Sequence, residues 1–153
     1  YVVFIGKDIG YKNEKSMNYI YRKAGGFRNK VLYYKEVQHD LLMSVIQNAY
    51  FILLPSRIEN FPNACVEAMS FRKIVIASKG VSFEQLIDDK VNGFLCENSN
   101  PKSLLEVVEE VMSLPSKKIN EIEINAGKTI KRLHPDITVR RLIEYYESIL
   151  NNN

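Results

Sequence analysis

The sequence has no tryptophan, two histidines and two cysteines among 153 residues. Cys65 and Cys96 lie far apart, without the short spacing of a metal-ligand or redox pair, so we expect two free thiols in a reducing cytoplasmic setting. His39 and His134 have no Cys, Asp or second His at ligand or triad spacing. We interpret them as ordinary surface or capping histidines and predict no metal site.

Long apolar runs and runs of like charge are also missing. No stretch reaches the roughly 18 consecutive apolar residues of a membrane span. Twenty-one basic and 18 acidic residues are mixed along the chain and leave a net charge of +3. This balance does not indicate nucleic-acid binding, but it leaves open a weak attraction to anionic surfaces and peripheral association with the inner face of a membrane.

Short apolar segments alternate with helical patterns along most of the chain. The apolar segments are rich in Val, Ile, Phe and Tyr and nearly continuous, as buried parallel strands are. They predict strands at Val2–Ile5, Val31–Tyr34, Phe51–Leu54, Ile74–Ala77 and Phe94–Cys96. The segments between them predict helices near Glu14–Ala24, His39–Asn48, Pro62–Phe71 and Phe83–Asp88. This alternation favours a doubly wound, parallel α/β sheet, which is a Rossmann-like fold.

The chain becomes helical after the last strand. Helices are expected at Pro101–Leu114, Asn120–Leu133 and Asp136–Leu150. We expect residues 1–132 to form the Rossmann-like domain and residues 133–153 a helical C-terminal segment. The last helix has an apolar stripe at helical spacing, which needs a surface to cover, either on this domain or on a missing neighbour. Because the chain starts directly on a strand and without Met, we expect it to be part of a longer protein.

The most unusual segment runs from Leu53 to Met69. Ligands of parallel sheets bind beyond the carboxyl ends of the strands, and here a strand runs through a loop into a helix. Pro62 suits the first helical turn, and the free N–H groups of that turn favour an anion such as a diphosphate. By contrast, Gly6–Gly10 after the first strand is an incomplete glycine motif and does not indicate a dinucleotide site.

Two glutamates accompany this segment. Glu59 lies in the loop and Glu67 lies on the helix, which is apolar almost all round and is therefore expected to be buried. A glutamate on a helix is most often solvated or salt-bridged, but a carboxylate on a buried helix is costly unless it is paired or faces a ligand. A pair of carboxylates suits a polyhydroxylated ligand, since ionised carboxylates accept hydrogen bonds from sugar hydroxyls.

The pattern Pro-Ser-x-x-Glu-Asn-Phe-Pro-Asn-x-x-x-Glu-Ala-Met resembles the E-x7-E motif of retaining glycosyltransferases of family 4. The flanks are similar to the family as well: Phe51–Ser56 before the motif, Val75–Ser78 after it, and the stretch from Glu84 through Gly93-Phe94-Leu95. The resemblance covers roughly residues 1–115. It implies the GT-B fold, in which two Rossmann-like domains face each other across a cleft and the C-terminal domain binds the nucleotide sugar.

The resemblance also implies the roles of individual residues. Glu67 would hold the ribose hydroxyls and Glu59 the hydroxyls of the donor sugar at the catalytic position. The backbone around Asn60, Phe61, Pro62, Asn63 and Ala64 would approach the sugar and diphosphate, and the turn with Lys35 and Val37 would lie by the base. The implied reaction is hexosyl transfer from a nucleoside diphosphate sugar with retention, without a cofactor or essential metal, in polysaccharide, lipopolysaccharide or other glycoconjugate biosynthesis.

Two departures from the family pattern matter. The family's first strand and the Arg and Lys that clamp the diphosphate are not seen before Tyr1, nor is the N-terminal domain that would bind a glycan or lipid-linked acceptor. We therefore expect the chain alone to be inactive. Arg72 and Ile74 stand where the family commonly has Gly and Pro, so Arg72 is expected to adopt a left-handed helix end at a cost of about 1 kcal/mol.

Two alternatives remain open. One is another GT-B enzyme, such as a nucleotide-sugar epimerase, although the scarcity of histidine argues against it. The other is a non-catalytic nucleotide-binding or flavodoxin-like module, such as a phosphoacceptor receiver. A receiver needs an Asp at the end of its central strand, where this chain has Pro55-Ser56.

Overall fold

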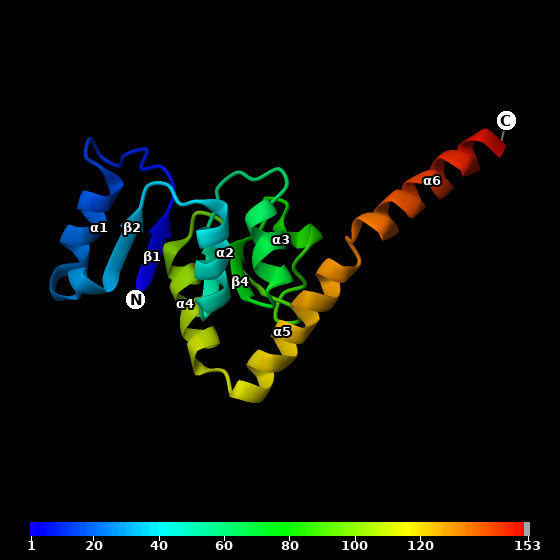
Figure 1. Ribbon diagram of the computed structural model, residues 1–153. Coiled ribbons are helices and arrows are strands. Elements are labelled where there is room, and N and C mark those ends of the chain that lie inside the picture. Colours follow the sequence, from blue (N-terminus) through cyan, green and yellow to red (C-terminus); the bar gives the residue numbers. More distant parts are fainter. Residues whose placement is uncertain (152–153) are drawn as a thin grey trace. The chain divides into compact units, whose positions relative to one another are not determined.

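The computed structural model describes residues 1–151 (Figure 1). Its strands are β1 Val2–Ile5, β2 Val31–Tyr34, β3 Phe51–Leu54, β4 Ile74–Ser78 and β5 Phe94–Cys96. Its α-helices are α1 Ser16–Ala24, α2 His39–Asn48, α3 Asn63–Ser70, α4 Pro101–Ser113, α5 Ser116–Lys131 and α6 Pro135–Asn151. Two 3-10 helices, η1 Gly25–Lys30 and η2 Phe83–Gln85, complete the series. The predicted strands are confirmed, β4 being one residue longer than expected.

All strand pairs are parallel, so the predicted parallel α/β fold is confirmed. The chain divides into two compact units, Tyr1–Ser44 and a second unit from Val45 onward. The first unit contains a sheet of β1 and β2, with Val2 opposite Val31. The second contains a sheet in the order β3-β4-β5, with Phe51 opposite Ile74. The central β4 therefore has a hydrogen-bonded neighbour on both sides.

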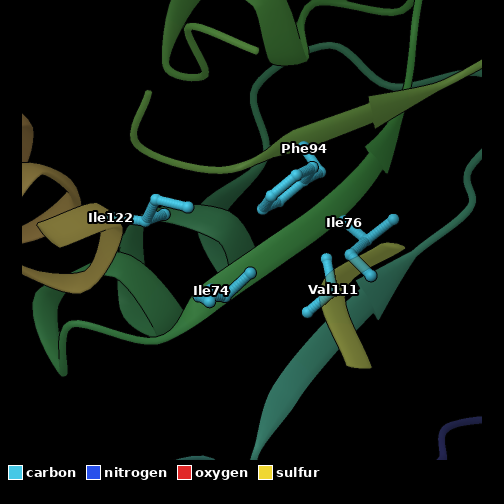
Figure 2. Packing of buried hydrophobic residues seen from close by; sticks show 5 residues of the cluster. All are labelled: Ile74, Ile76, Phe94, Val111 and Ile122. Atoms are coloured by element: carbon cyan, nitrogen blue, oxygen red, sulfur yellow. The ribbon is translucent and has the colours of Figure 1, made fainter. Parts of the chain in front are cut away.

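The core of the second unit surrounds β4. Ile74 and Ile76 of β4 pack with Phe94 of β5, Val111 of α4 and Ile122 of α5 (Figure 2), and each of these side chains is at most 1% exposed. Complete burial of one aliphatic or aromatic side chain stabilises a fold by about 1.5–3 kcal/mol. This cluster therefore fixes α4 and α5 against the sheet. Loops follow the carboxyl ends of the strands.

The expected burial of every strand is correct only for β4 and β5. Residues of β1, β2 and β3 are exposed or half-buried, Val2 being 49% exposed. Within its own sheet, each of these three strands is an edge strand in the part of the chain that the structure describes. β5 is also an edge strand, but α4 packs against it. An apolar sequence alone does not distinguish a covered edge strand from an uncovered one.

The helix predicted at Phe83–Asp88 is wrong, because the helical turn ends at Gln85. The Asp88 N–H donates to Oδ1 of Asn92 at 2.8 Å, so it is not available to continue a helix. Asn92 is 2% exposed and also donates to the Leu86 carbonyl and to Oγ1 of Thr129. At Gly93 a Cβ atom would lie 3.1 Å from the Val75 carbonyl oxygen, so glycine allows the close approach of β4.

The remaining helix boundaries differ by smaller amounts. α1 begins two residues later than predicted, and α3 begins at Asn63 and lacks Pro62 and Phe71. α5 begins at Ser116, four residues before the predicted start, because the chain resumes helical geometry directly after Pro115. α6 was predicted within one residue at each end, and its side chains from Pro135 to Leu150 are all exposed. Among residues 1–151, no helix is long and apolar enough to cross a bilayer.

The loop after β1 is organised by Asp8. Its Oδ1 accepts hydrogen bonds from the N–H groups of Gly10 and Ser16, and its Oδ2 accepts one from Met17 at 3.1 Å. The Met17 N–H is the largest of the causes that lower the pKa of Asp8 to about 2. The Asp8 carboxylate thus accepts hydrogen bonds from the first N–H groups of α1, so these donors are not available to a phosphate.

We predict that Asp8→Asn loses a stabilisation that depends on pH. Because the folded pKa of Asp8 is depressed, its contribution is present above the unfolded value of 3.8 and is lost as the pH falls through about 2. Urea unfolding, monitored by the amide signals of α1, measures the free energy of unfolding. At neutral pH this free energy should be larger for wild type than for Asp8→Asn, and near pH 2 the two values should be nearly equal. Asp88→Asn is the matched control, since its exposed carboxylate has no partner among residues 1–151. A difference that persists unchanged to pH 2 would contradict the capping role.

Arg72 adopts the predicted left-handed conformation after α3, with φ of 57°. Its side chain lies against Gly127 of α5, where a Cβ atom would be 3.1 Å from Cγ of Arg72. At residue 72 the left-handed backbone conformation is unfavourable, whereas the contact of the side chain with Gly127 is available only to a long side chain.

We predict that Arg72→Gly is more stable than Arg72→Ala by about 1 kcal/mol, since both lose the side chain and only glycine removes the left-handed cost. Urea midpoints at equal m-values would measure this difference. If the alanine variant were equally stable, the backbone at residue 72 would not be strained.

Candidate functional site

The carboxyl ends of β3, β4 and β5 lie at one edge of the second unit's sheet, because the strands are parallel. The loops that leave these ends are joined by side chains. Oγ of Ser82, after β4, donates to the Glu59 carbonyl at 3.0 Å. Nδ2 of Asn98, after β5, donates to the Arg57 carbonyl at 3.2 Å. The loop between β3 and α3 is therefore held from both neighbouring loops.

Ser82 and Asn98 were not identified from the sequence. Neither belongs to a motif of charged or metal-ligating residues, and both contacts join residues far apart in the chain. A signal was nevertheless present, since both residues follow a predicted strand and the carboxyl ends of parallel strands meet at one edge.

The loop that carries Ser82 is itself held by Glu84. The Glu84 carboxylate accepts a hydrogen bond from the Gly80 N–H, which is the main cause that lowers the pKa of Glu84. Ser82 has a φ of 75°, a left-handed conformation that costs a non-glycine residue about 1–2 kcal/mol. The Glu84 carboxylate therefore has a structural function: it stabilises the turn that aims Ser82 at Glu59.

Glu59 is half-buried in the loop before α3. Its Oε1 accepts a hydrogen bond from the Asn60 N–H at 3.1 Å, and its carbonyl accepts the bond from Ser82. The neighbouring Asn60 and Phe61 are exposed. Glu59 thus lies at the carboxyl edge of the sheet with one carboxylate oxygen, Oε2, that has no partner among residues 1–151.

α3 begins at Asn63, so Pro62 is the residue before the helix and not part of its first turn as predicted. The N–H groups of Cys65 and Val66 donate to the Pro62 carbonyl, and that of Asn63 donates to the Phe61 carbonyl. The Ala64 N–H has no acceptor among the described residues. Pro62 is buried, while Asn63 and Ala64 are exposed, so this free donor faces an accessible surface.

The N-terminus of α3 differs from those of α1 and α4, which also follow strands. Asp8 caps α1, and Oδ1 of Asn100 accepts hydrogen bonds from the Lys102 and Ser103 N–H groups of α4. α3 has no side-chain cap. α5 lacks one too, but it follows a helix and not a strand. An uncapped helix start with a free N–H attracts anions, so α3 offers a phosphate position that α1 and α4 do not.

The prediction that α3 is buried all round is wrong. Cys65, Ala68 and Met69 are fully buried and face the side where α3 packs on β4 and α5, whereas Asn63, Ala64 and Ser70 are exposed. The small Ala and Cys side chains allow close packing on one face, and no described residue covers the other. Helical spacing puts Glu67 on the same face as Asn63 and Ser70, and its side chain is half-buried there.

The Glu67 carboxylate forms no hydrogen bond or ion pair with any of residues 1–151. Some acidic side chains of the second unit have cationic partners, such as Glu110 with Lys90 at 2.7 Å, whereas others, such as Glu123, have none among residues 1–151. A half-buried carboxylate without a partner is under-satisfied, and ligand hydroxyls are suitable donors for it. The unpaired Glu67, the free Ala64 N–H and Glu59 all belong to the β3–α3 segment.

Lys35 and Val37 lie in the first unit, in the loop between β2 and α2. Lys35 is exposed and Val37 is half-buried. Their expected place beside the base stays a prediction.

The cysteines are free and buried, and burial raises the pKa of Cys65 to about 12. Thiolate chemistry at Cys65 is therefore suppressed at neutral pH. The described part of the chain contains no group of three His, Cys, Asp or Glu side chains that could hold a metal ion.

Comparison with known proteins places this geometry in a family. The family model of glycosyl transferases group 1 matches residues 1–129. A glycosyltransferase of Haemophilus influenzae is 30% identical over 100 residues, a match that covers 63% of this chain and 26% of the relative. One of Methanocaldococcus jannaschii is 34% identical over 74 residues, which cover 48% of this chain and 21% of the relative. The chain thus spans about a quarter of the length of these relatives.

Solved structures share the fold. A glycosyltransferase of Rickettsia africae superposes with a TM-score of 0.79 at 20% identity, over 100% of this chain and 41% of that one. Anabaena HepE in complex with UDP gives a TM-score of 0.77 at 20% identity, over 95% of this chain and 40% of that one. These neighbours have the GT-B glycosyltransferase fold. Since the family model covers most of the chain and the fold agrees, this chain belongs to the family of group 1 glycosyl transferases.

Proposed function

We propose that this chain is the donor-binding domain of a retaining glycosyltransferase of the family 4 type and binds a nucleoside diphosphate sugar at the start of α3. The observation that carries the proposal is the uncapped N-terminus of α3, flanked by Glu59 and by the unpaired Glu67. HepE, which has a similar fold, was solved with UDP and with UDP-glucose, which supports a ligand of this class. Membership of the family favours this function over the epimerase and receiver alternatives.

Each part of the ligand has a matching group in the proposed complex. The diphosphate accepts a hydrogen bond from the Ala64 N–H and is stabilised by the dipole of α3. The Glu67 carboxylate accepts hydrogen bonds from the ribose hydroxyls. Glu59 accepts hydrogen bonds from the donor sugar, and Lys35 and Val37 approach the base.

The proposed reaction is transfer of a hexosyl group without a cofactor or an essential metal. As the diphosphate leaves, positive charge develops on the sugar, and a carboxylate at Glu59 stabilises that charge. The N–H groups at the start of α3 stabilise the negative charge that develops on the leaving diphosphate.

The acceptor in this proposal is a glycan or lipid-linked sugar bound by a second domain, in cytoplasmic synthesis of a polysaccharide, lipopolysaccharide or other glycoconjugate. The exposed apolar stripe of α6 supports a second domain, since such a face is stabilised when another surface covers it. Its residues are Val139, Leu142, Ile143, Tyr146, Ile149 and Leu150, each at least 45% exposed.

Glu67→Ala should weaken the binding of UDP to this chain by about tenfold or more, because a charge-assisted hydrogen bond contributes about 1.5–3 kcal/mol. Titration of UDP, followed by NMR, would measure the dissociation constants. Glu123→Ala on α5 is the matched control, since Glu123 is also half-buried and has no partner among residues 1–151. Equal affinity of wild type and Glu67→Ala would refute the ribose assignment.

Glu59→Gln should lower kcat by about 10²-fold in an enzyme that joins this chain to an acceptor-binding domain, a size typical of one lost electrostatic contact. The substitution keeps the shape of the side chain and removes its charge, so the dissociation constant of the nucleotide should barely change. Glu67→Ala should instead raise the KM of the donor, because the ribose contact is similar in ground and transition states. Steady-state kinetics of both variants distinguish the two roles. Full kcat in Glu59→Gln, with turnover abolished in Glu67→Ala at saturating donor, would reverse the assignment.

A further inference from the structure

The net positive charge of the chain lies in the first unit. Tyr1–Ser44 contains eight lysines and arginines and four carboxylates, a net charge of +4, whereas the remaining residues contain thirteen and fourteen, a net charge of −1. Two of the four carboxylates are already engaged, since Asp8 caps α1 and Glu14 pairs with Arg22 at 2.5 Å. The first unit therefore presents uncompensated positive charge.

Part of this charge gathers where α1 turns into η1. Arg28 lies over the ring of Tyr21, with 5.1 Å from the guanidinium to the ring centre. An open hollow is lined by Tyr21, Gly26, Arg28, Asn29 and Val31, and a second hollow that shares Tyr21 and Arg28 also includes Arg22. Lys23 and Lys30 lie over the rings of Tyr19 and Tyr1. Neither they nor Arg28 forms an ion pair with any of residues 1–151.

Phe27 lies at the centre of this turn and is 76% exposed. Every residue of η1, Gly25–Lys30, is exposed. The turn therefore presents an aromatic side chain to the solvent between basic residues and beside a hollow lined by arginine. Exposed single apolar residues are ordinary. An exposed aromatic side chain beside cations that form no ion pair is a composition suited to the boundary between lipid headgroups and acyl chains.

We propose that the basic turn, defined as Tyr21–Lys30, docks this chain on an anionic lipid bilayer. Phe27 enters the headgroup region, and Arg28, Lys30 and Lys23 face the lipid phosphates. The net charge of the first unit attracts the surface, and the aromatic tip supplies the apolar contact. A solvated basic face is the competing interpretation, and it predicts salt-dependent attraction without insertion.

Because the chain has no tryptophan, Phe27→Trp creates a single fluorescent reporter at the tip. With vesicles of equal parts phosphatidylcholine and phosphatidylglycerol, its emission should shift to the blue and be quenched by brominated lipids. With phosphatidylcholine alone, neither change should occur. Leu105→Trp, at an exposed position of α4, is the matched control and should not respond. The same response at both positions, or none at Phe27→Trp, would overturn the proposal.

Cosedimentation with the anionic vesicles tests the charges. Arg28→Gln with Lys30→Gln should weaken binding about 30-fold, since each basic residue near an anionic surface contributes about fivefold in affinity. Lys128→Gln with Lys131→Gln removes the same charge from exposed positions of α5 and should have little effect. An equal loss of vesicle affinity in the two double variants would show that net charge alone attracts the chain to the vesicles, and it would refute the basic turn as the docking site.

The apolar stripe of α6 is a second exposed face that can bind lipid. Leu142→Ser with Ile143→Ser should leave vesicle binding unchanged if the basic turn is the docking site. Loss of binding in this variant, with binding retained in Arg28→Gln and Lys30→Gln, would assign docking to α6 and refute the proposal. Binding to heparin or polyuridylate without binding to anionic vesicles would also refute it, by identifying the patch as a polyanion site.

Discussion

The complete burial of β4 is the constraint on which the second unit depends. All five of its residues are buried, and it has hydrogen-bonded neighbours on both sides. α4 and α5 contribute Val111 and Ile122 to the same cluster, and α3 packs on β4 and α5 through Cys65, Ala68 and Met69. This packing fixes the carboxyl ends of β3, β4 and β5 at one edge and sets the start of α3 beside them.

The site at that edge is held mainly by groups that bind no ligand in the proposed complex. Ser82 and Asn98 fix the backbone at Glu59 and Arg57, and Glu84 fixes the turn that contains Ser82. Side chains cap the N-termini of α1 and α4, whereas no side chain among residues 1–151 caps the start of α3. The fold leaves a hydrogen-bond donor and acceptors of this site unpaired and holds them on a rigid support. Such a site suits a ligand with phosphate groups that accept hydrogen bonds and hydroxyl groups that donate them.

The strands and the helices α1, α2 and α3 between them could be predicted because their apolar periodicity is local. The ends of η2 and α5 could not, because the end of η2 depends on Asn92, whose contacts reach Thr129. The left-handed conformation of Arg72 was predicted from the family pattern, and the φ of 57° confirms it. The burial of α3 was overestimated, because a helix of small apolar residues can pack on one face and leave the other open.

The sequence identified Glu59 and Glu67 as candidates. In the structure both belong to the β3–α3 segment, where Glu59 accepts a hydrogen bond from the Asn60 N–H and the Glu67 carboxylate has no partner among residues 1–151. The central claim is that the nucleotide binds at the start of α3. Amide chemical shifts during titration with UDP test it most directly. The largest changes should occur at Asn60, Phe61, Asn63, Ala64 and Glu67. Little change should occur at Ser16 and Met17, whose N–H groups already donate to Asp8. Changes concentrated at Ser16 and Met17, with none at Ala64, would contradict the central claim.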